Sequence, residues 1–229
     1  MGATTTVPSS LPSRDQVRRA VVEAARALFA NGVMSHSGHA NISGRVSPEQ
    51  IFLTVRGQVK DLTVDGLALV GVDGIVLEGE LDPANAEIVE MHTGVYRLRA
   101  EVGGIIHTHS PHLLAFALAN KPLECRYEAL LRFGQASAVP VVPWAPRGSE
   151  RSVGGILDAI RENPGTQAVL LGNHGVLVFA QTPERAVALL TVMEEAAEAE
   201  LAAESLGGAL GFPPGALEDV RASMARVAK

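Results

Sequence analysis

The chain has a single cysteine, few aromatic residues and no long apolar run, and each scarcity excludes a class of protein. The one cysteine, Cys125, cannot form a disulfide within a monomer, which is typical of proteins of the reducing cytoplasm. No stretch approaches the roughly 18 apolar residues of a membrane-spanning helix, so we expect no membrane partner. Residues 1–13 also lack the apolar segment of a secretory signal peptide. We therefore expect a cytoplasmic protein.

The sequence also lacks an excess of positively charged residues. The formal net charge is −6, and the acidic residues are spread along the chain rather than gathered in blocks. A protein that binds nucleic acid through phosphates needs a basic patch. The sequence therefore argues against nucleic acid and leaves a small molecule as the expected partner.

What is present is the composition of one α/β domain. The 229 residues are 47% hydrophobic, enough to build a sizeable core, and aromatic residues make up only 4%. Residues 1–14 are predicted to be a flexible arm and residues 15–229 one domain. Strand and helix patterns alternate, with hairpins among them, which favours an α/β sandwich around a mixed sheet.

The predicted elements follow from apolar periodicity and turn signals. The predicted helices span residues 15–31, 84–100, 111–118, 152–163 and 182–206, with a short helix within 213–229. The predicted strands span residues 41–46, 51–54, 67–72, 75–77, 103–108, 139–142, 168–171 and 175–179.

Three histidines in apolar surroundings carry the strongest chemical signal. His107 and His109 end a run of apolar residues, and side chains two apart on a strand project to the same face. His174 follows a second apolar run between Gly172 and Gly175, which let the backbone come close to a site. Three imidazoles with an open position are typical of a catalytic metal site, whereas structural zinc sites are closed. We predict one divalent transition metal per chain, with Zn²⁺ first and Mn²⁺, Co²⁺ or Fe²⁺ as alternatives.

Several short motifs occur in an order that resembles the class II aldolase/adducin family. The resemblance covers roughly residues 15–210 and includes the fuculose-phosphate aldolases and ribulose-phosphate epimerases. The motifs are Gly38-His39-Ala40-Asn41-Ile42-Ser43-Gly44-Arg45, the segment from Glu87 to Tyr96, His107-Thr108-His109-Ser110, Arg147-Gly148-Ser149 and Asn173-His174-Gly175.

The resemblance implies a fold, an assembly and a set of site residues. The implied fold is a three-layer sandwich around a mixed, mainly antiparallel sheet. The implied assembly is a homotetramer with active sites at subunit interfaces. The metal would be held by His107, His109 and His174, and Glu87 would act as the acid/base.

The spacing of Glu87 departs from the family pattern. The family places its acid four residues before the helical histidine, but Glu87 is five residues before His92 and the position at four is Ile88. One residue on a helix is a rotation of about 100°, so a slip before the helix would be needed to restore the geometry. Glu90 is the fallback, and Glu87 could instead complement a helix N-terminus.

Residues of the matched motifs are the candidate substrate contacts. The family's phosphate aldolases use a Ser-Ser pair and a Thr-x-Thr-Gly turn, where this chain has Asn85-Ala86 and Thr54-Val55-Arg56-Gly57. Arginine binds a carboxylate as readily as a phosphate. The predicted catalytic residues besides Glu87 are His36 and His39 as proton donors or acceptors, and the predicted substrate contacts are Asn41, Arg56, Gly57, Ser149 and Tyr96.

Ordinary structural roles remain open for several of these residues. Arg56 could be a solvated turn residue, and His36 and His39 could be ordinary loop residues. Tyr96 could protonate a carbanion or belong to the core, and Ser149 could cap the following helix.

These features predict a metal-dependent carbon–carbon lyase. Its substrate would be a small hydroxylated carboxylate, and its reaction decarboxylation or retro-aldol cleavage through a metal-stabilised enolate. A phosphosugar aldolase or epimerase of the same family is the nearest alternative. A non-catalytic adducin-like scaffold and a metal hydrolase are further alternatives.

Overall fold

The computed structural model describes residues 12–227, which form one eight-stranded sheet flanked by helices. Most of the predicted arm, residues 1–11, lies outside this range. The strands are β1 (Ala40–Ser47), β2 (Gln50–Thr54), β3 (Leu67–Gly71), β4 (Val76–Glu78), β5 (Gly104–Thr108), β6 (Val141–Val142), β7 (Ala168–Leu171) and β8 (Gly175–Ala180). The helices are α1 (Arg14–Ala30), α2 (Pro83–Ala86), α3 (Val89–Leu98), α4 (Pro111–Ala119), α5 (Glu128–Phe133), α6 (Glu150–Glu162), α7 (Pro183–Ala203) and α8 (Ala216–Val227).

The sheet is mixed and mainly antiparallel, as predicted. Its strand order is β4-β3-β2-β1-β5-β8-β7-β6, and within it β6 and β7 are the parallel pair. β5 therefore lies in the middle of the sheet between β1 and β8, with antiparallel neighbours on both sides. Every residue of β5 is buried, which explains why its sequence is an unbroken apolar run up to His107.

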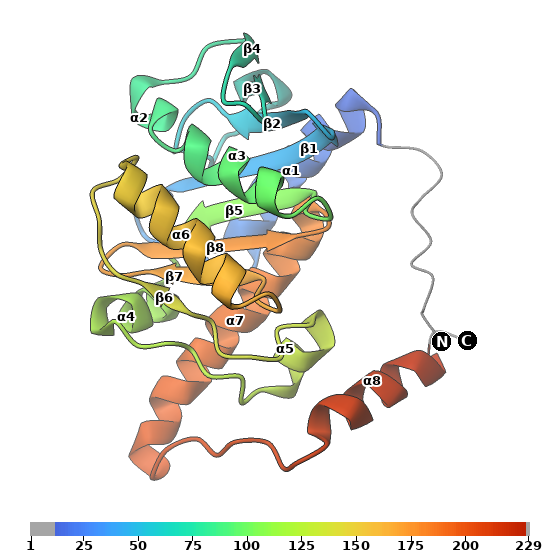
Figure 1. The fold of residues 1–229 in the computed structure, drawn as a ribbon, viewed down its shortest axis with the longest axis vertical. Helices are drawn as coiled ribbons and strands as arrows, with labels where there is room; N and C mark the ends of the chain where they lie inside the picture. Colours follow the sequence, from blue (N-terminus) through green and yellow to red (C-terminus); the bar gives the residue numbers. More distant parts are fainter. Residues whose placement is uncertain (1–11, 228–229) are drawn as a thin grey trace.

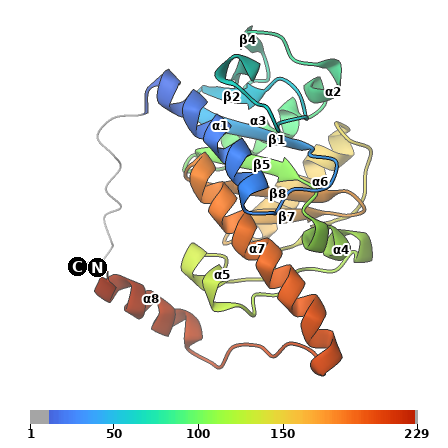
Figure 2. The same cartoon turned by 180° about the vertical axis from the view of Figure 1, so that it is seen from behind.

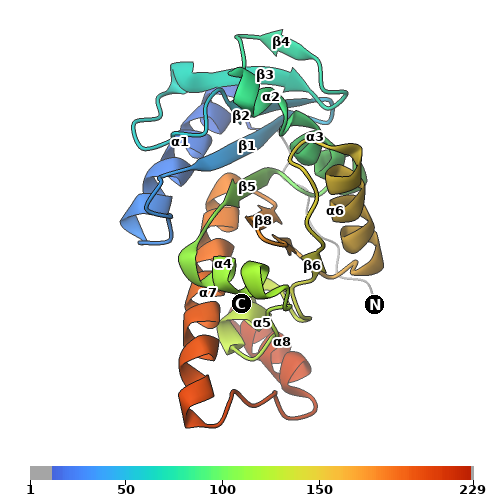
Figure 3. The same cartoon turned by 90° about the vertical axis from the view of Figure 1, so that its left-hand side faces the viewer.

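Helices cover both faces of the sheet and make three layers. Figure 1 shows α3 and α6 in front of the sheet, and Figure 2 shows α1 and α7 crossing its other face. The side view in Figure 3 places the sheet between these two helical layers. The alternation along β5 separates two cores, because Ile105 packs under α3 and α6 whereas Ile106 packs with α1 and α7. The three-layer sandwich is confirmed.

Local sequence signals fix where the two helices behind the sheet begin. Ser13 and Gln16 form a reciprocal capping box at the start of α1. At the start of α7, the Thr182 hydroxyl accepts from the backbone N–H of Arg185, and Pro183 fills the first turn. Both helix starts agree with the predicted ones to within one residue.

α4 begins directly after the His107–His109 segment and is capped from another helix. The buried carboxylate of Glu194, on α7, accepts from the backbone N–H groups of His112 and Leu113 at 2.8 and 3.0 Å. A carboxylate at a helix N-terminus complements the positive end of the helix dipole. This contact fixes the segment that follows His109 against α7.

The predicted helix over residues 84–100 is wrong in one respect, because it is broken at Glu87 and Ile88. The backbone N–H of Ile88 bonds to the carbonyl of Asn85, three residues back, so the turn is tighter than an α-helix. Each side of the break is anchored to the sheet separately, Asn85 on the Thr54 carbonyl and His92 on Ser43. The tight turn therefore lies between two separate contacts with the sheet.

Two further expectations differ from the structure. The segment that begins at Glu128, for which no helix is predicted above, is the helix α5, which ends at Gly134 in the left-handed region (φ 87°). The predicted helix over 182–206 changes to a 3-10 turn, Glu204–Leu206, after α7. Among residues 12–227, no helix combines the length and the apolar character needed to cross a membrane.

Two glycines provide a direct test of this packing. A Cβ at Gly104, on β5, would lie 2.3 Å from the backbone nitrogen of Pro183, whereas a Cβ at Gly154 inside α6 meets nothing within 4 Å. Since backbone atoms cannot swing aside, we expect Gly104→Ala to lower the free energy of unfolding by about 3 kcal/mol or more. Gly154→Ala should raise it by about 0.5–1 kcal/mol through helix propensity. Urea denaturation followed by circular dichroism measures both, and equal effects would contradict the packing described for β5.

Candidate metal and substrate site

The sheet brings His107, His109 and His174 together at the carboxyl end of β5. One potential ligand atom from each ring lies within 4.8 Å of the others. The ring centroids are 4.7 Å apart for His107 and His174, 5.1 Å for His107 and His109, and 5.2 Å for His109 and His174. Two of these imidazoles come from the end of β5, and the third from the loop between β7 and β8.

The free nitrogens of this cluster fit a metal ion. The Nδ1 of His107 donates to the carbonyl of Val176 at 3.0 Å, which leaves the Nε2 of that ring with its lone pair. The Nε2 atoms of His107 and His109 are buried and have no hydrogen-bond partner among the described residues. Unpartnered buried nitrogens are costly unless something binds them. Three such imidazoles suit Zn²⁺ and other first-row divalent ions.

Glycine and asparagine allow the close approach that builds this cluster. A Cβ at Gly175 would lie 2.6 Å from the His109 ring and 2.6 Å from the carbonyl of Thr108, so no larger residue fits there. Asn173 adopts a left-handed conformation (φ 56°), which asparagine tolerates better than most residues. The short loop at Asn173 therefore delivers His174 back towards the end of β5.

His39 adjoins the cluster, whereas His36 is exposed in the preceding turn. The ring of His39 stacks on that of His109 with centroids 5.4 Å apart and an interplanar angle of 4°. Gly57 makes room for it, because a Cβ at Gly57 would lie 2.0 Å from the His39 ring. Of the two predicted catalytic histidines, the structure brings His39 to the site, and Gly57 supports that ring.

Asn41 lies directly beside the cluster on the neighbouring strand. It pairs with His107 across the β1–β5 ladder, so both side chains project to the same face. Its Nδ2 donates to Asn85 at 3.1 Å, and the Nδ2 of Asn85 donates to the Thr54 carbonyl at 2.9 Å. The Oδ1 of Asn41 is buried and has no protein partner in the described chain. Asn41 therefore keeps one unpartnered amide oxygen on the face of the sheet that carries His107.

Tyr96, a residue of α3, is buried in the core between this helix and the sheet. Its hydroxyl is 3.0 Å from the Oγ of Ser43, which in turn shares a 2.8 Å hydrogen bond with the Nδ1 of His92. Arg45 continues the row along β1 and donates to the carbonyls of Tyr96 and Val102. Asn41, Ser43 and Arg45 are two residues apart, so one face of β1 holds the α2–α3 segment at successive points.

Glu87 lies at the break between α2 and α3 and forms an ion pair with Arg147. The distance from the Nε of Arg147 to the Oε2 of Glu87 is 2.9 Å, and the Glu87 side chain is 54% exposed. Glu87 is not among the groups that cluster with the three histidines. The fallback residue Glu90 instead pairs with Arg97 along α3.

The two remaining candidate substrate contacts lie at the surface or at a helix end. Arg56 is exposed on the turn after β2. The Oγ of Ser149 accepts from the backbone N–H of Ser152 and donates to the carbonyl of Pro146. Ser149 is the N-cap of α6, so the structure supports the capping interpretation of this residue.

Burial keeps the imidazoles neutral. It lowers the pKa of His109 to about 4, with smaller contributions from His174, His39 and Arg147. Burial also lowers the pKa of His107 well below its usual value, and the pKa values of His39 and His174 fall for the same reason, with Arg147 adding to both. Neutral imidazoles at pH 7 present free lone pairs, which is the form that binds a metal.

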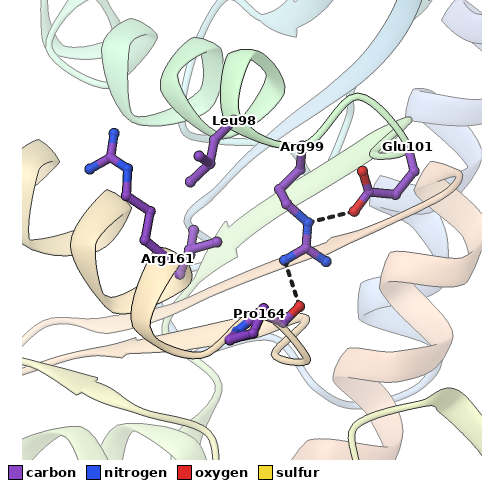
Figure 4. Close-up of a pocket in the computed structure, with 6 residues that line it drawn as sticks. Leu98, Arg99, Glu101, Arg161 and Pro164 are labelled. Carbon is purple, nitrogen blue, oxygen red and sulfur yellow. Dashed lines mark hydrogen bonds and ion pairs between the residues drawn. The ribbon is translucent and has the colours of Figure 1, made fainter.

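A hollow elsewhere on the surface is not a site comparable to the histidine cluster. It measures about 350 Å³ and lies at the ends of α3 and α6, near residues that precede β5. Figure 4 shows that Arg99 points to Glu101 and the carbonyl of Pro164, while Arg161 lies apart from them. These arginines are near helix C-termini, where positive charge complements the dipole. The histidine cluster therefore remains the candidate site.

The family that fits this chain is described as "Class II Aldolase and Adducin N-terminal domain" and matches residues 19–201. The chain belongs to this family.

Individual relatives span most of the chain. It is 28% identical over 206 residues to a methylthioribulose-1-phosphate dehydratase of Azotobacter vinelandii, covering 86% of this chain and 98% of the relative. It is 29% identical over 208 residues to a 3,4-dihydroxyphthalate decarboxylase of Arthrobacter keyseri, covering 84% and 81%. The fold is similar to that of a solved L-fuculose 1-phosphate aldolase, with a TM-score of 0.81 and 22% identity over 95% of this chain and 99% of that one.

Two features of the site were not predicted from the sequence. Arg147 was noted as part of a motif, but its pairing with Glu87 connects two segments 60 residues apart. The Ser43 contact of His92 was also missed. The alternation of Asn41, Ser43 and Arg45 along one strand was the available signal, since it places all three side chains on the face that α3 covers.

The ligand cluster predicts metal binding that depends on His174. We expect about one equivalent of transition metal per chain in tag-free wild-type protein. His174→Gln should weaken Zn²⁺ binding by more than the roughly 10–100-fold typical of losing an outer-shell partner. Elemental analysis and competition with a chelating dye measure this. His36→Gln is the matched control, and wild-type affinity in His174→Gln would refute the ligand set.

Burial of His92 predicts a loss of stability in acid. Burial lowers the pKa of His92 to about 3, so the unfolded chain binds this proton first as the pH falls below about 6.5. The stability that depends on neutral His92 is therefore complete above pH 7 and declines towards pH 3, by up to about 1.4 kcal/mol per pH unit. Urea denaturation of metal-free His92→Gln should show a shallower decline than the wild type, and parallel curves would contradict the buried neutral state.

Proposed function

We propose that this protein is a divalent-metal-dependent carbon–carbon lyase that cleaves a small hydroxylated carboxylate by decarboxylation or retro-aldol reaction. The observation that carries the proposal is the cluster of His107, His109 and His174, with buried unpartnered Nε2 atoms on His107 and His109. Membership of a family with aldolase, dehydratase and decarboxylase relatives supports an enzyme of the lyase type.

The proposed reaction needs both a metal ion and hydrogen bonds from the protein. His107, His109 and His174 would hold the ion, which supplies a Lewis acid that stabilises negative charge developing on the substrate. His39, stacked on His109, and the Oδ1 of Asn41 offer hydrogen bonds that orient substrate hydroxyls. Neutral ligands leave the charge of the ion uncancelled, which strengthens this electrostatic stabilisation.

Glu87 is the proposed acid/base. Its carboxylate is exposed and lies on a tight turn rather than inside a helix, so its direction is not set by a regular helix. In this role Glu87 would deliver a proton to the substrate carbon after the carbon–carbon bond breaks. The break before α3 is the place where the chain departs from a regular helix, five residues before His92.

The hydrogen bonds of Thr54 and Asn85 favour a carboxylate substrate over a phosphorylated one. Thr54 is fully buried, and its hydroxyl accepts from the backbone N–H of Ile42. Asn85 is 2% exposed and bonds to Asn41 and Thr54. The polar groups of both side chains are used in hydrogen bonds within the protein. A buried structural network therefore stands where the phosphate aldolases have hydroxyl groups that bind a phosphate.

The relatives support both this substrate class and its nearest alternative. The decarboxylase relative is named for a dihydroxylated aromatic dicarboxylate, whereas the dehydratase and aldolase relatives are named for phosphorylated sugars. The phosphosugar reaction is therefore the second candidate. We also infer from the family a homotetramer with active sites at subunit interfaces.

The test is a substrate panel with metal-loaded enzyme. Dihydroxybenzoates, 4-hydroxy-2-oxo acids and 1-phosphoketoses would be assayed for release of CO₂ or aldehyde. We expect turnover of a hydroxylated carboxylate and a loss of kcat of about 10²–10⁴-fold in Glu87→Gln, the range for general acid–base catalysis. Glu90→Gln is the matched control and should retain kcat. Cleavage of phosphosugars alone would overturn the substrate assignment, and absence of any metal-dependent turnover would favour the scaffold.

A further inference from the structure

The ion pair between Glu87 and Arg147 is built into the structure rather than a chance surface contact. Arg147 lies in the segment between β6 and α6, and it also donates to the carbonyl of Ala84 in α2. The next residue, Gly148, is in the left-handed region (φ 73°), and a Cβ there would lie 2.9 Å from the carbonyl of Glu87. The backbone at Gly148 therefore rests on Glu87, which holds the two side chains opposite each other.

Arg147 also lies close to the histidine cluster. Residues of its segment, Trp144 and Ala145, line one small hollow together with His174. The charge of Arg147 lowers the pKa values of His39, His109 and His174. The segment that carries the guanidinium therefore borders the proposed metal site.

The guanidinium retains capacity for an incoming anion. Its Nε contacts Glu87 and its Nη2 contacts Ala84, while the side chain remains 32% exposed. Arginine binds carboxylates through two parallel N–H groups in a planar fork. In this structure a carboxylate, that of Glu87, already occupies one arm of the fork.

We infer that Arg147 is the specificity residue that binds the substrate's carboxylate, and that Glu87 occupies this position until the substrate displaces it. The inference rests on the proposed function and names the group that recognises its substrate class. Exchange of one carboxylate for another keeps the charge of the pair balanced. The same exchange frees Glu87 from Arg147 when a substrate is present, which couples binding to the availability of the proposed acid/base.

The test uses binding rather than turnover. Salicylate and salicylamide share a ring and a hydroxyl, but salicylamide lacks the carboxylate. Titration calorimetry on the zinc-loaded protein would compare them in wild type, Arg147→Gln and Glu87→Gln. We expect Arg147→Gln to weaken salicylate binding by about 10-fold or more, as for a charge-assisted pair, and to leave salicylamide binding unchanged. Arg161→Gln, which removes another exposed arginine–carboxylate pair, is the control.

The sign of the Glu87→Gln effect separates recognition from a structural role. If Glu87 competes for Arg147, its removal should strengthen salicylate binding by about 2–5-fold, the range of an exposed ion pair. If the pair only fastens α2, its removal should weaken binding or leave it unchanged, and the inference falls. The inference is also overturned if wild type does not bind salicylate, or if Arg56→Gln loses this binding while Arg147→Gln keeps it.

The two proposals fail separately. Salicylate binding that depends on Arg147, in a protein that turns over none of the panel, would support carboxylate recognition and refute the lyase reaction. Turnover of a hydroxylated carboxylate with an unchanged KM in Arg147→Gln would support the lyase reaction and refute carboxylate recognition by Arg147.

Discussion

The pairing of β5 with β8 is the constraint on which the rest of the site depends. The antiparallel ladder pairs His107 with Leu177, and the carbonyl of the preceding residue, Val176, accepts a hydrogen bond from the Nδ1 of His107. The same pairing brings the residue after His174, Gly175, against His109 with no room for a side chain. Three imidazoles therefore converge because two central strands are in one register, and a shift by one residue would turn His107 towards the opposite layer.

Beside this cluster, the α2–α3 segment is interrupted at Glu87 and Ile88. It is held to β1 by Asn85 and His92, but between these anchors the chain makes a tight turn at Glu87. An acidic residue inside a regular helix would have one direction available, set by the helix rotation. On the turn, Glu87 is free of that restriction and pairs with Arg147 from a distant segment. The ion pair therefore joins the turn before α3 to the segment between β6 and α6.

The site also explains how members of one family carry different chemistry on a shared fold. The relatives of this chain include a dehydratase, a decarboxylase and aldolases. In this chain the differences lie in the surrounding polar groups. Asn85 and Thr54 are committed to a buried network, while Arg147 contributes a cation beside His174.

The sequence by itself determined the layers of the fold and the members of the histidine cluster. Continuous apolar runs marked β5 and β7, and the two-residue spacing of His107 and His109 fixed their common face, because alternation along a strand is a local property. The tertiary structure decided the break at Glu87 and the partner of Arg147. It also decided that His39, and not His36, joins the cluster. Those outcomes depend on contacts between residues far apart in the chain. Local sequence preferences carry no information about which distant residues will meet.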